Sequence, residues 1–333
     1  MPVRGASGAR GDHVKDKIYG MVTEKIIAAL ENGTVPWRQP WNPAYGRPLR
    51  MNNGKPYRGI NVLLLGLSAD QHHYTSPYWG TYDHIAEASG MVKDAASRWV
   101  SPDGTPRGVR KGERGELVVF WRQIRVKDAD AEDGTKIIPL LRYYKVFNAC
   151  QADALPERFY PKPREASGAA ELPVPQSVLD GYLANDGPAL IHGGNVAGYD
   201  PVRDEIVLPE RALFTTDAGY YYSGFHESGH STGHPRRLNR PGVQPSEVIH
   251  FGSQRYSKEE LAAEMTAAMV MAETGLSTDD SIAQNAAYIS GWLSKLRDDQ
   301  RLVVLAAAQA QRATDLIMGR EEEAGEMPVS PPE

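Results

Sequence analysis

Apolar residues recur at helical spacing in four stretches of the chain. The first follows a glycine-rich arm of twelve residues, which we expect to be flexible, and it stops before Gly33 and Pro36. The same spacing returns three times in the second half of the chain. These periodicities predict four helices, over residues 14–32, 217–232, 258–273 and 281–318.

Runs rich in β-branched and aromatic residues predict strands between these helices. Two such runs, Leu117–Trp121 and Leu140–Phe147, flank the acidic segment Asp128–Gly134, which we interpret as the tip of an antiparallel hairpin. A third run, Asp204–Leu208, precedes the second predicted helix. Helices combined with antiparallel strands predict an α+β fold.

A segment rich in proline, serine, glycine and alanine separates the two groups of elements, and such composition is typical of a linker. A length of 333 residues also favours two domains over one. We therefore expect an N-terminal α+β domain, a linker, a second domain and a disordered tail. Their predicted bounds are 13–155, 156–175, 176–319 and 320–333.

Charge is distributed unevenly between the two halves. The first 150 residues carry 22 basic and 15 acidic side chains, a net charge of +7, and the remainder carries 15 basic and 27 acidic, a net charge of −12, which together give −5. Five of the six tryptophans also lie in the basic half. A basic, aromatic-rich half beside an acidic half indicates a nucleic-acid-binding module next to a different domain. The alternative is ordinary variation in charge.

Membrane and secreted classes are disfavoured by the sequence. The longest apolar run, Leu302–Ala308, is far shorter than the ~20 residues that a transmembrane helix needs. The N-terminus has no apolar stretch typical of a secretory signal, and Cys150 is the only cysteine. We expect a cytoplasmic protein with no membrane partner.

The sequence His226-Glu227-Ser228-Gly229-His230 is an H-E-x-x-H motif. On a helix, positions i and i+4 share a face, so both imidazoles can bind one zinc ion, and Glu227 can accept a proton from water beside it. The flanks favour such a helix, because Asp217 can cap its start, and a glycine and a proline follow the motif. Gly229 lowers the stability of a helix relative to alanine. The close approach of another backbone or of a ligand would explain a glycine at this position.

A hydrolytic zinc site needs a third protein ligand. A metzincin is excluded because Arg236 occupies the position of its third histidine. The favoured candidate is Glu260 on the following predicted helix, with Glu264 and His234 as alternatives and His250 as a weaker one. Manganese is the alternative metal, because sites of this ligand type bind both.

Glu260 also has a purely structural interpretation. Ser257-x-x-Glu260 matches a capping box, which would occupy the carboxylate with backbone amides. However, small residues such as Ala263 let this helix pack closely against the motif helix. We expect that whichever of Glu260 and Glu264 does not bind the metal orients a histidine ring.

Several separate motifs now occur in a recognisable order. Those of the first half are Val35-Pro36-Trp37, Pro40-Trp41, Tyr57–Asn61, Val109–Glu113 and Val146–Gln151. Those of the second half are Tyr221-Tyr222 before the motif, Thr232–His234, Arg237-Leu238 and Glu259–Glu264. Residues 14–155 resemble the N-terminal domain of ArdC-type antirestriction proteins, which is shared with TraC-type primases of plasmids. Residues 199–318 resemble the zincin-like metallopeptidase domain of the same proteins, although Ser231 stands where we expect an aromatic residue.

The resemblance implies a single-stranded-DNA-binding domain joined to a metal-dependent peptidase, carried by mobile elements such as plasmids to protect incoming DNA during conjugation. Binding of single strands requires basic side chains for phosphates and aromatic faces for bases. The candidates are Trp37, Arg38, Trp41, Tyr57, Arg58, Asn61, Arg110 and Lys111. The alternative for each tryptophan is a place in the core.

Three functions remain open at this point. In the first, a DNA-binding enzyme uses Glu227 as general base to cleave an unidentified protein substrate. In the second, the protein coats DNA and the metallopeptidase fold is a non-catalytic scaffold. In the third, the chain is a primase accessory module. An intact His-Glu-His set favours the first, because a scaffold has no need of Glu227.

Overall fold

The computed structural model describes residues 6–42, 44–127, 135–163, 173–243, 254–276 and 286–321. The chain forms two domains with mixed helix and sheet content, as the α+β prediction requires. No helix in this described part of the chain is long and apolar enough to cross a bilayer. The predicted hairpin tip, His250 and the tail beyond residue 321 lie outside these ranges.

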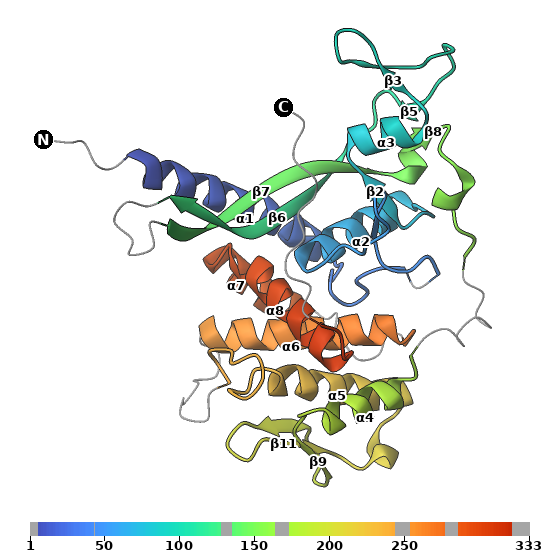
Figure 1. The fold of residues 1–333 in the computed structure, drawn as a ribbon. Helices are drawn as coiled ribbons and strands as arrows, with labels where there is room; N and C mark the ends of the chain where they lie inside the picture. Colours follow the sequence, from blue (N-terminus) through green and yellow to red (C-terminus); the bar gives the residue numbers. More distant parts are fainter. Residues whose placement is uncertain are drawn as a thin grey trace, which may run out of the picture.

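A long hairpin and a long helix dominate the N-terminal domain (Figure 1). Strands β6 (Glu116–Lys127) and β7 (Thr135–Asn148) pair antiparallel, which confirms the predicted pairing. Helix α1 (Ala6–Glu31) begins eight residues before the predicted start, so the expected flexible arm is wrong from Ala6 onward.

Short elements complete the domain. Strands β1 (Leu49–Arg50) and β2 (Tyr78–Gly80) extend the hairpin into a sheet of order β1-β2-β7-β6. Helix α2 (Ile60–His72) packs on this sheet because five of its first six residues are buried. The remaining elements are α3 (Tyr82–Ala88), the pairs β3 (Val92–Lys93) with β4 (Trp99–Val100) and β5 (Gly108–Val109) with β8 (Ala152–Asp153), and η1 (Ala149–Gln151).

The first part of the expected linker packs on the N-terminal domain. The 3-10 helix η2 (Glu157–Phe159) inserts Phe159, which is 3% exposed. The Ser76 hydroxyl donates a hydrogen bond to the Phe159 carbonyl. The described chain resumes at residue 173, and helix α4 (Pro175–Ala184) begins with the proline at its first position.

The C-terminal domain places helices on a small sheet. Strands β9 (Ala189–His192), β10 (Gly198–Asp200) and β11 (Glu205–Leu208) have the order β10-β11-β9, and β11 confirms the predicted strand. The short η4 (Arg211–Leu213) leads into the helices. These are α5 (Asp217–Ser231), α6 (Gln254–Glu273), α7 (Ala286–Asp298) and α8 (Leu302–Ile317).

The prediction of one continuous helix over 281–318 is wrong. Helix α7 ends at Asp298, and Asp299 accepts a hydrogen bond from the backbone N–H of Arg301 in a turn before α8. A carboxylate that binds nearby backbone in this way competes with continuation of the helix. Both helices retain the expected apolar face.

The two domains share one hydrophobic core. Figure 1 shows α7 and α8 lying between α6 on one side and the hairpin with α1 and α2 on the other. The buried cluster at this interface draws residues from both domains. Its members include Ile18, Ile26, Trp37, Leu63, Leu117, Met265, Trp292 and Val303.

Candidate metal centre and nucleic-acid interface

The H-E-x-x-H motif lies on helix α5, as predicted. Thr216, directly before the helix, is its N-cap: the Thr216 side chain accepts a hydrogen bond from the Gly219 N–H at 3.0 Å, so Asp217 is not the cap. The helix ends at Ser231, before Gly233 and the following proline. Its apolar face, which includes the fully buried Phe225, anchors it to the domain core.

Three potential metal ligands converge between α5 and α6. The Nε2 atoms of His226 and His230 are 3.2 Å apart. Glu260 Oε1 lies 3.2 Å from His226 Nε2, and its Oε2 lies 3.8 Å from His230 Nε2. Among the described residues this is the one group of three such donors that lies within 4.8 Å.

The donor set fits a divalent transition metal. Ligands bound tetrahedrally at about 2.1 Å lie roughly 3.4 Å from one another, close to the separations of this group. Two imidazoles and a carboxylate leave one tetrahedral position open, as in hydrolytic zinc sites. The three side chains are 16–25% exposed, so the group of donors is accessible from solvent.

Gly229 allows the two helices to approach. A Cβ atom there would lie 3.1 Å from Ala263 Cα and 3.3 Å from Thr266 Cβ on α6. The close approach of another backbone, one of the two explanations expected for this glycine, is therefore confirmed. Ala263 is itself fully buried, and the contact brings Glu260 to the histidines.

A buried ion pair that the sequence analysis missed orients His230. The Nδ1 atom of His230 donates to Glu259 Oε1 at 3.3 Å, and Arg240 donates to both oxygens of Glu259. Burial would raise the pKa of Glu259, but the charges and hydrogen bonds of Arg240 and His230 outweigh it and lower the pKa to about 2. Burial lowers the pKa of His230, but Glu259, together with the charges of Glu227 and Glu260, raises it by more, so the net shift is upward. The expectation that Glu260 or Glu264 orients a histidine is thus wrong for His230.

A second arginine fixes the end of α5. Arg237 donates to the Ser231 carbonyl at 2.7 Å and forms an ion pair with Asp204 beside β11. Ser231 itself lies 2.8 Å from the Tyr182 hydroxyl. The small residue at this position therefore contacts a tyrosine from α4.

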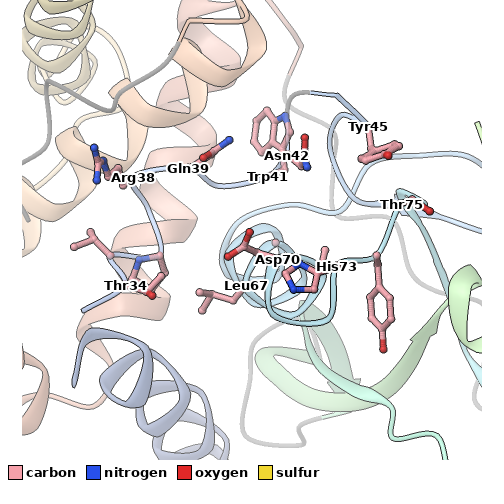
Figure 2. Close-up of a pocket in the computed structure, with 15 residues that line it drawn as sticks. Thr34, Arg38, Gln39, Trp41, Asn42, Tyr45, Leu67, Asp70, His73 and Thr75 are labelled. Atoms are coloured by element: carbon pink, nitrogen blue, oxygen red, sulfur yellow. The ribbon is translucent and has the colours of Figure 1, made fainter. Parts of the chain in front are cut away.

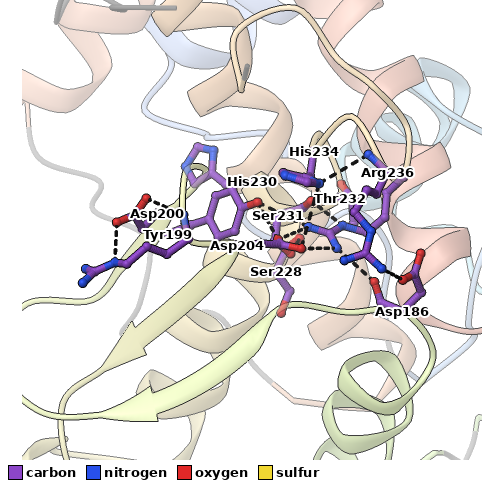
Figure 3. Close-up of polar contacts among 12 residues, drawn as sticks. Asp186, Tyr199, Asp200, Asp204, Ser228, His230, Ser231, Thr232, His234 and Arg236 are labelled. Carbon is purple, nitrogen blue, oxygen red and sulfur yellow. Dashed lines mark hydrogen bonds and ion pairs between the residues drawn. The ribbon is translucent and has the colours of Figure 1, made fainter. Parts of the chain in front are cut away.

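The alternative ligands lie apart from the group of three donors. His234 is beyond the end of α5, where its Nδ1 accepts from the Arg236 N–H at 3.3 Å and lies 3.9 Å from Asp204 (Figure 3). Glu264 accepts hydrogen bonds from Trp37 and Tyr288 instead. Its pKa is raised, chiefly by burial.

The alternative interpretation of Ser257 and Glu260 as a capping box is wrong. Helix α6 begins at Gln254, so Ser257 lies within the helix and its hydroxyl has no hydrogen-bond partner among the described residues. Glu260 is therefore not needed as a cap. Glu227, the candidate general base, is 8% exposed on the motif helix.

Family models match both halves of the chain. The model of the N-terminal domain of anti-restriction factor ArdC matches residues 16–147, and that of zincin-like metallopeptidases matches residues 177–309. The metal-free crystal structure of the antirestriction ArdC protein from plasmid R388 superposes with a TM-score of 0.67 at 36% identity, covering 91% of this chain and 99% of that chain. The chain belongs to the ArdC family of antirestriction proteins. The resemblance inferred from the motifs is confirmed.

Other relatives of this ArdC-family protein extend the comparison. The Mn(II)-bound structure of the R388 protein also gives a TM-score of 0.67, at 38% identity over 90% of this chain and 97% of that chain. "Uncharacterized protein y4eC" of Sinorhizobium fredii is 34% identical over 92% of this chain and 93% of its own length. DNA primase TraC of Escherichia coli is 31% identical over 92% of this chain, which spans 20% of TraC.

The residues expected to bind DNA do not form one surface. Trp37 is fully buried, so the core alternative holds for it. Tyr57 is 9% exposed and Asn61 exchanges two 2.7 Å hydrogen bonds with the backbone of Val119, so both contribute to the fold. Arg58 forms an ion pair with Asp315 of the C-terminal domain.

Arg38 and Trp41 line a common cavity of about 370 Å³, the loop cavity, between the proline-rich segment and the end of α2 (Figure 2). Tyr45 and His73 also contribute to its wall. Trp41 is 5% exposed there, and the Arg47 guanidinium lies 5.4 Å from its ring centre.

The last two candidates lie on the glycine-rich turn after β5. Arg110 forms ion pairs with Glu113 and Asp153 in the glycine-rich turn after β5, and Lys111 is exposed beside it. Arg110 also donates to the Cys150 carbonyl, and the Cys150 thiol lies 3.6 Å from the hydroxyl of Thr75 in the cavity wall, so this turn adjoins the loop cavity.

Proposed function

We propose that this ArdC-family protein binds single-stranded DNA and carries a metal-dependent peptidase site. The observation that supports the peptidase most strongly is the convergence of His226, His230 and Glu260, with Glu227 on the same helix. We place the domain boundary within the expected linker, after the segment that packs on the N-terminal domain.

Each residue of the proposed site has a separate role in peptide hydrolysis. When bound by His226, His230 and Glu260, zinc or manganese supplies Lewis acidity. Glu227 acts as general base, taking a proton from the attacking water and delivering it to the leaving amine. Glu259 and Arg240 hold the His230 ring so that its Nε2 faces the other donors.

The substitution Glu227→Gln tests the catalytic part of the proposal. Glutamine keeps the side-chain volume but cannot accept the proton, so we expect proteolysis of a casein mixture to fall by ~10²–10⁴ with metal content unchanged. Glu205→Gln on β11 is the matched control. Equal proteolysis by the wild type and Glu227→Gln would rule out Glu227 as the base.

For DNA, we propose that the loop cavity receives part of a single strand. Arg38 offers a positive charge there, and Trp41 and Tyr45 offer aromatic surface. We expect fluorescence anisotropy to report tighter binding of an oligothymidylate than of a duplex of equal length, with affinity that falls steeply as salt rises. Equal affinity for both forms at the same salt would contradict single-strand recognition.

The scaffold alternative makes a different prediction for antirestriction. If coating of DNA is sufficient, Glu227→Gln should protect transferred DNA from restriction in a conjugation assay as well as the wild type does. If proteolysis is required, the same variant should lose protection while binding DNA normally.

A further inference from the structure

A second buried carboxylate lies beside the candidate metal site. Glu264 follows Glu260 by one turn of α6, and side chains four positions apart share one face of a helix. Glu264 is 8% exposed. It is not one of the three converging donors, so its burial needs a separate explanation.

Two neutral donors hold this carboxylate. Glu264 Oε2 accepts from Trp37 Nε1 at 3.0 Å and from the Tyr288 hydroxyl. Trp37 Nε1 is also 3.0 Å from the Tyr288 oxygen, and the Trp292 ring packs edge-on against Trp37 with centroids 5.9 Å apart. Trp37 comes from the N-terminal domain, α6 carries Glu264, and α7 carries Tyr288, so three distant segments meet at one oxygen atom.

Comparison with the neighbouring Glu259 shows that Glu264 lacks a positively charged partner among the described residues. Glu259 is equally buried, but Arg240 neutralises its charge. Among the residues that the structure describes, no lysine or arginine forms an ion pair with Glu264. A buried carboxylate without a positive partner is costly. A divalent cation held one helical turn away would supply that positive charge.

We propose that Glu264, held by Trp37 and Tyr288, is an outer carboxylate of the metal centre that strengthens its affinity for a divalent cation. The inference rests on the proposed metal site and deepens it. Trp37 belongs to the N-terminal domain, so its hydrogen bond to Glu264 makes that domain part of the proposed metal centre. Trp37 and Tyr288 act as positioning residues, since they reach the site only through Glu264.

The first test measures Mn²⁺ affinity of the full-length protein by isothermal titration calorimetry. Glu264→Gln keeps the size and removes the charge, and we expect it to weaken Mn²⁺ binding about tenfold or more. Glu273→Gln is the matched control, since it removes a charge from the same helix about 20 Å from Glu260. Mn²⁺ affinity of Glu264→Gln equal to that of the wild type would overturn the proposal.

The second test separates positioning from packing. Trp37→Phe and Tyr288→Phe each remove one donor and keep a ring, so each should weaken Mn²⁺ binding several-fold when Glu264 is present. Neither should weaken it further in the Glu264→Gln background. Trp79→Phe, at an equally buried tryptophan on β2, should leave the affinity unchanged. Equal losses in both backgrounds would assign the effect to packing and refute the role of the two donors.

Failure of this inference can be distinguished from failure of the metal site itself. If His226→Ala with His230→Ala abolishes Mn²⁺ binding while Glu264→Gln does not change it, only the role of the outer carboxylate is refuted. If the double histidine variant keeps its Mn²⁺, the proposed metal site is refuted and the inference with it.

Discussion

The candidate metal centre and the loop cavity are organised in opposite ways. The metal centre gathers three donor atoms within 4.8 Å on two packed helices, and a buried ion pair orients one of them. The loop cavity is about 370 Å³ and is lined by fifteen residues from a proline-rich segment, α2 and the turn after it. In a converging site each atom is necessary, whereas in an extended cavity each residue contributes a fraction of the binding free energy. Single substitutions should therefore abolish function at the first site and only weaken it at the second.

The largest effect is expected at the motif histidines. Replacing His226 and His230 together by alanine removes two of the three ligands, so tightly bound metal should be lost entirely. Elemental analysis of the purified protein measures this loss. His234→Ala is the control, since His234 faces Asp204, and it should keep the wild-type metal content. Loss of metal from the control would instead make His234 part of the site.

A smaller but severe effect is expected at Arg240. Arg240→Ala leaves the Glu259 carboxylate buried without its positive partner, and breaking such a pair typically costs ~3–5 kcal/mol of unfolding free energy. Denaturant unfolding of the variant measures the cost. The exposed Arg203→Ala serves as control and should change stability by less than about 0.5 kcal/mol. A similar small change for Arg240→Ala would mean that the ion pair is not needed to hold α5 on α6.

Gly229→Ala tests the contact between the two helices. The added methyl group meets Ala263 Cα at 3.1 Å, which should cost roughly 1–3 kcal/mol through overpacking, partly offset by the higher helix propensity of alanine. Thermal unfolding and Mn²⁺ titration of the same variant measure both consequences. Gly291→Ala on α7 is the control, because nothing lies within 4 Å of that position. A gain in stability by Gly229→Ala would show that close approach does not constrain this site.

The smallest effect is expected in the loop cavity. Arg38→Ala should weaken binding of an oligothymidylate only a few-fold and lower the slope of log affinity against log salt by about 1. Anisotropy titrations at several salt concentrations measure both quantities. Arg98→Ala, at an exposed arginine that does not line the cavity, is the control. A complete loss of binding by Arg38→Ala would mean that the DNA site converges on few atoms, as the metal centre does.

Features that depend on local spacing were predictable from the sequence. The motif helix follows from apolar residues at helical spacing, and strand β11 and the β6–β7 hairpin follow from runs rich in β-branched and aromatic residues. Both signals are contained within a short stretch of sequence. Glu260 was the favoured third ligand because its helix carries small residues that permit close packing. The structure brings it to the histidines.

Features that depend on distant partners were not predictable. Trp37 resembles an exposed base-stacking residue within a proline-rich segment, but its indole N–H bonds a glutamate 227 positions away. Arg240 and Glu259 lie in different elements, and no periodicity relates them. The one signal for the pair is that Glu259 and Glu260 are adjacent on a helix. Adjacent helical side chains point in different directions, so one of the two glutamates needs a partner other than the metal.

The core shared by the two domains determines what happens when the two halves of the chain are separated. Cutting the chain between the domains would leave Ile18 and Trp37 on one fragment, and Trp292 and Val303 on the other, without their apolar partners. Either half produced alone would expose this apolar surface to water, so we expect each fragment to aggregate. In the match to TraC, a single alignment runs through 92% of the present chain and occupies only a fifth of the larger protein. The part of TraC that resembles this chain therefore corresponds to both domains together.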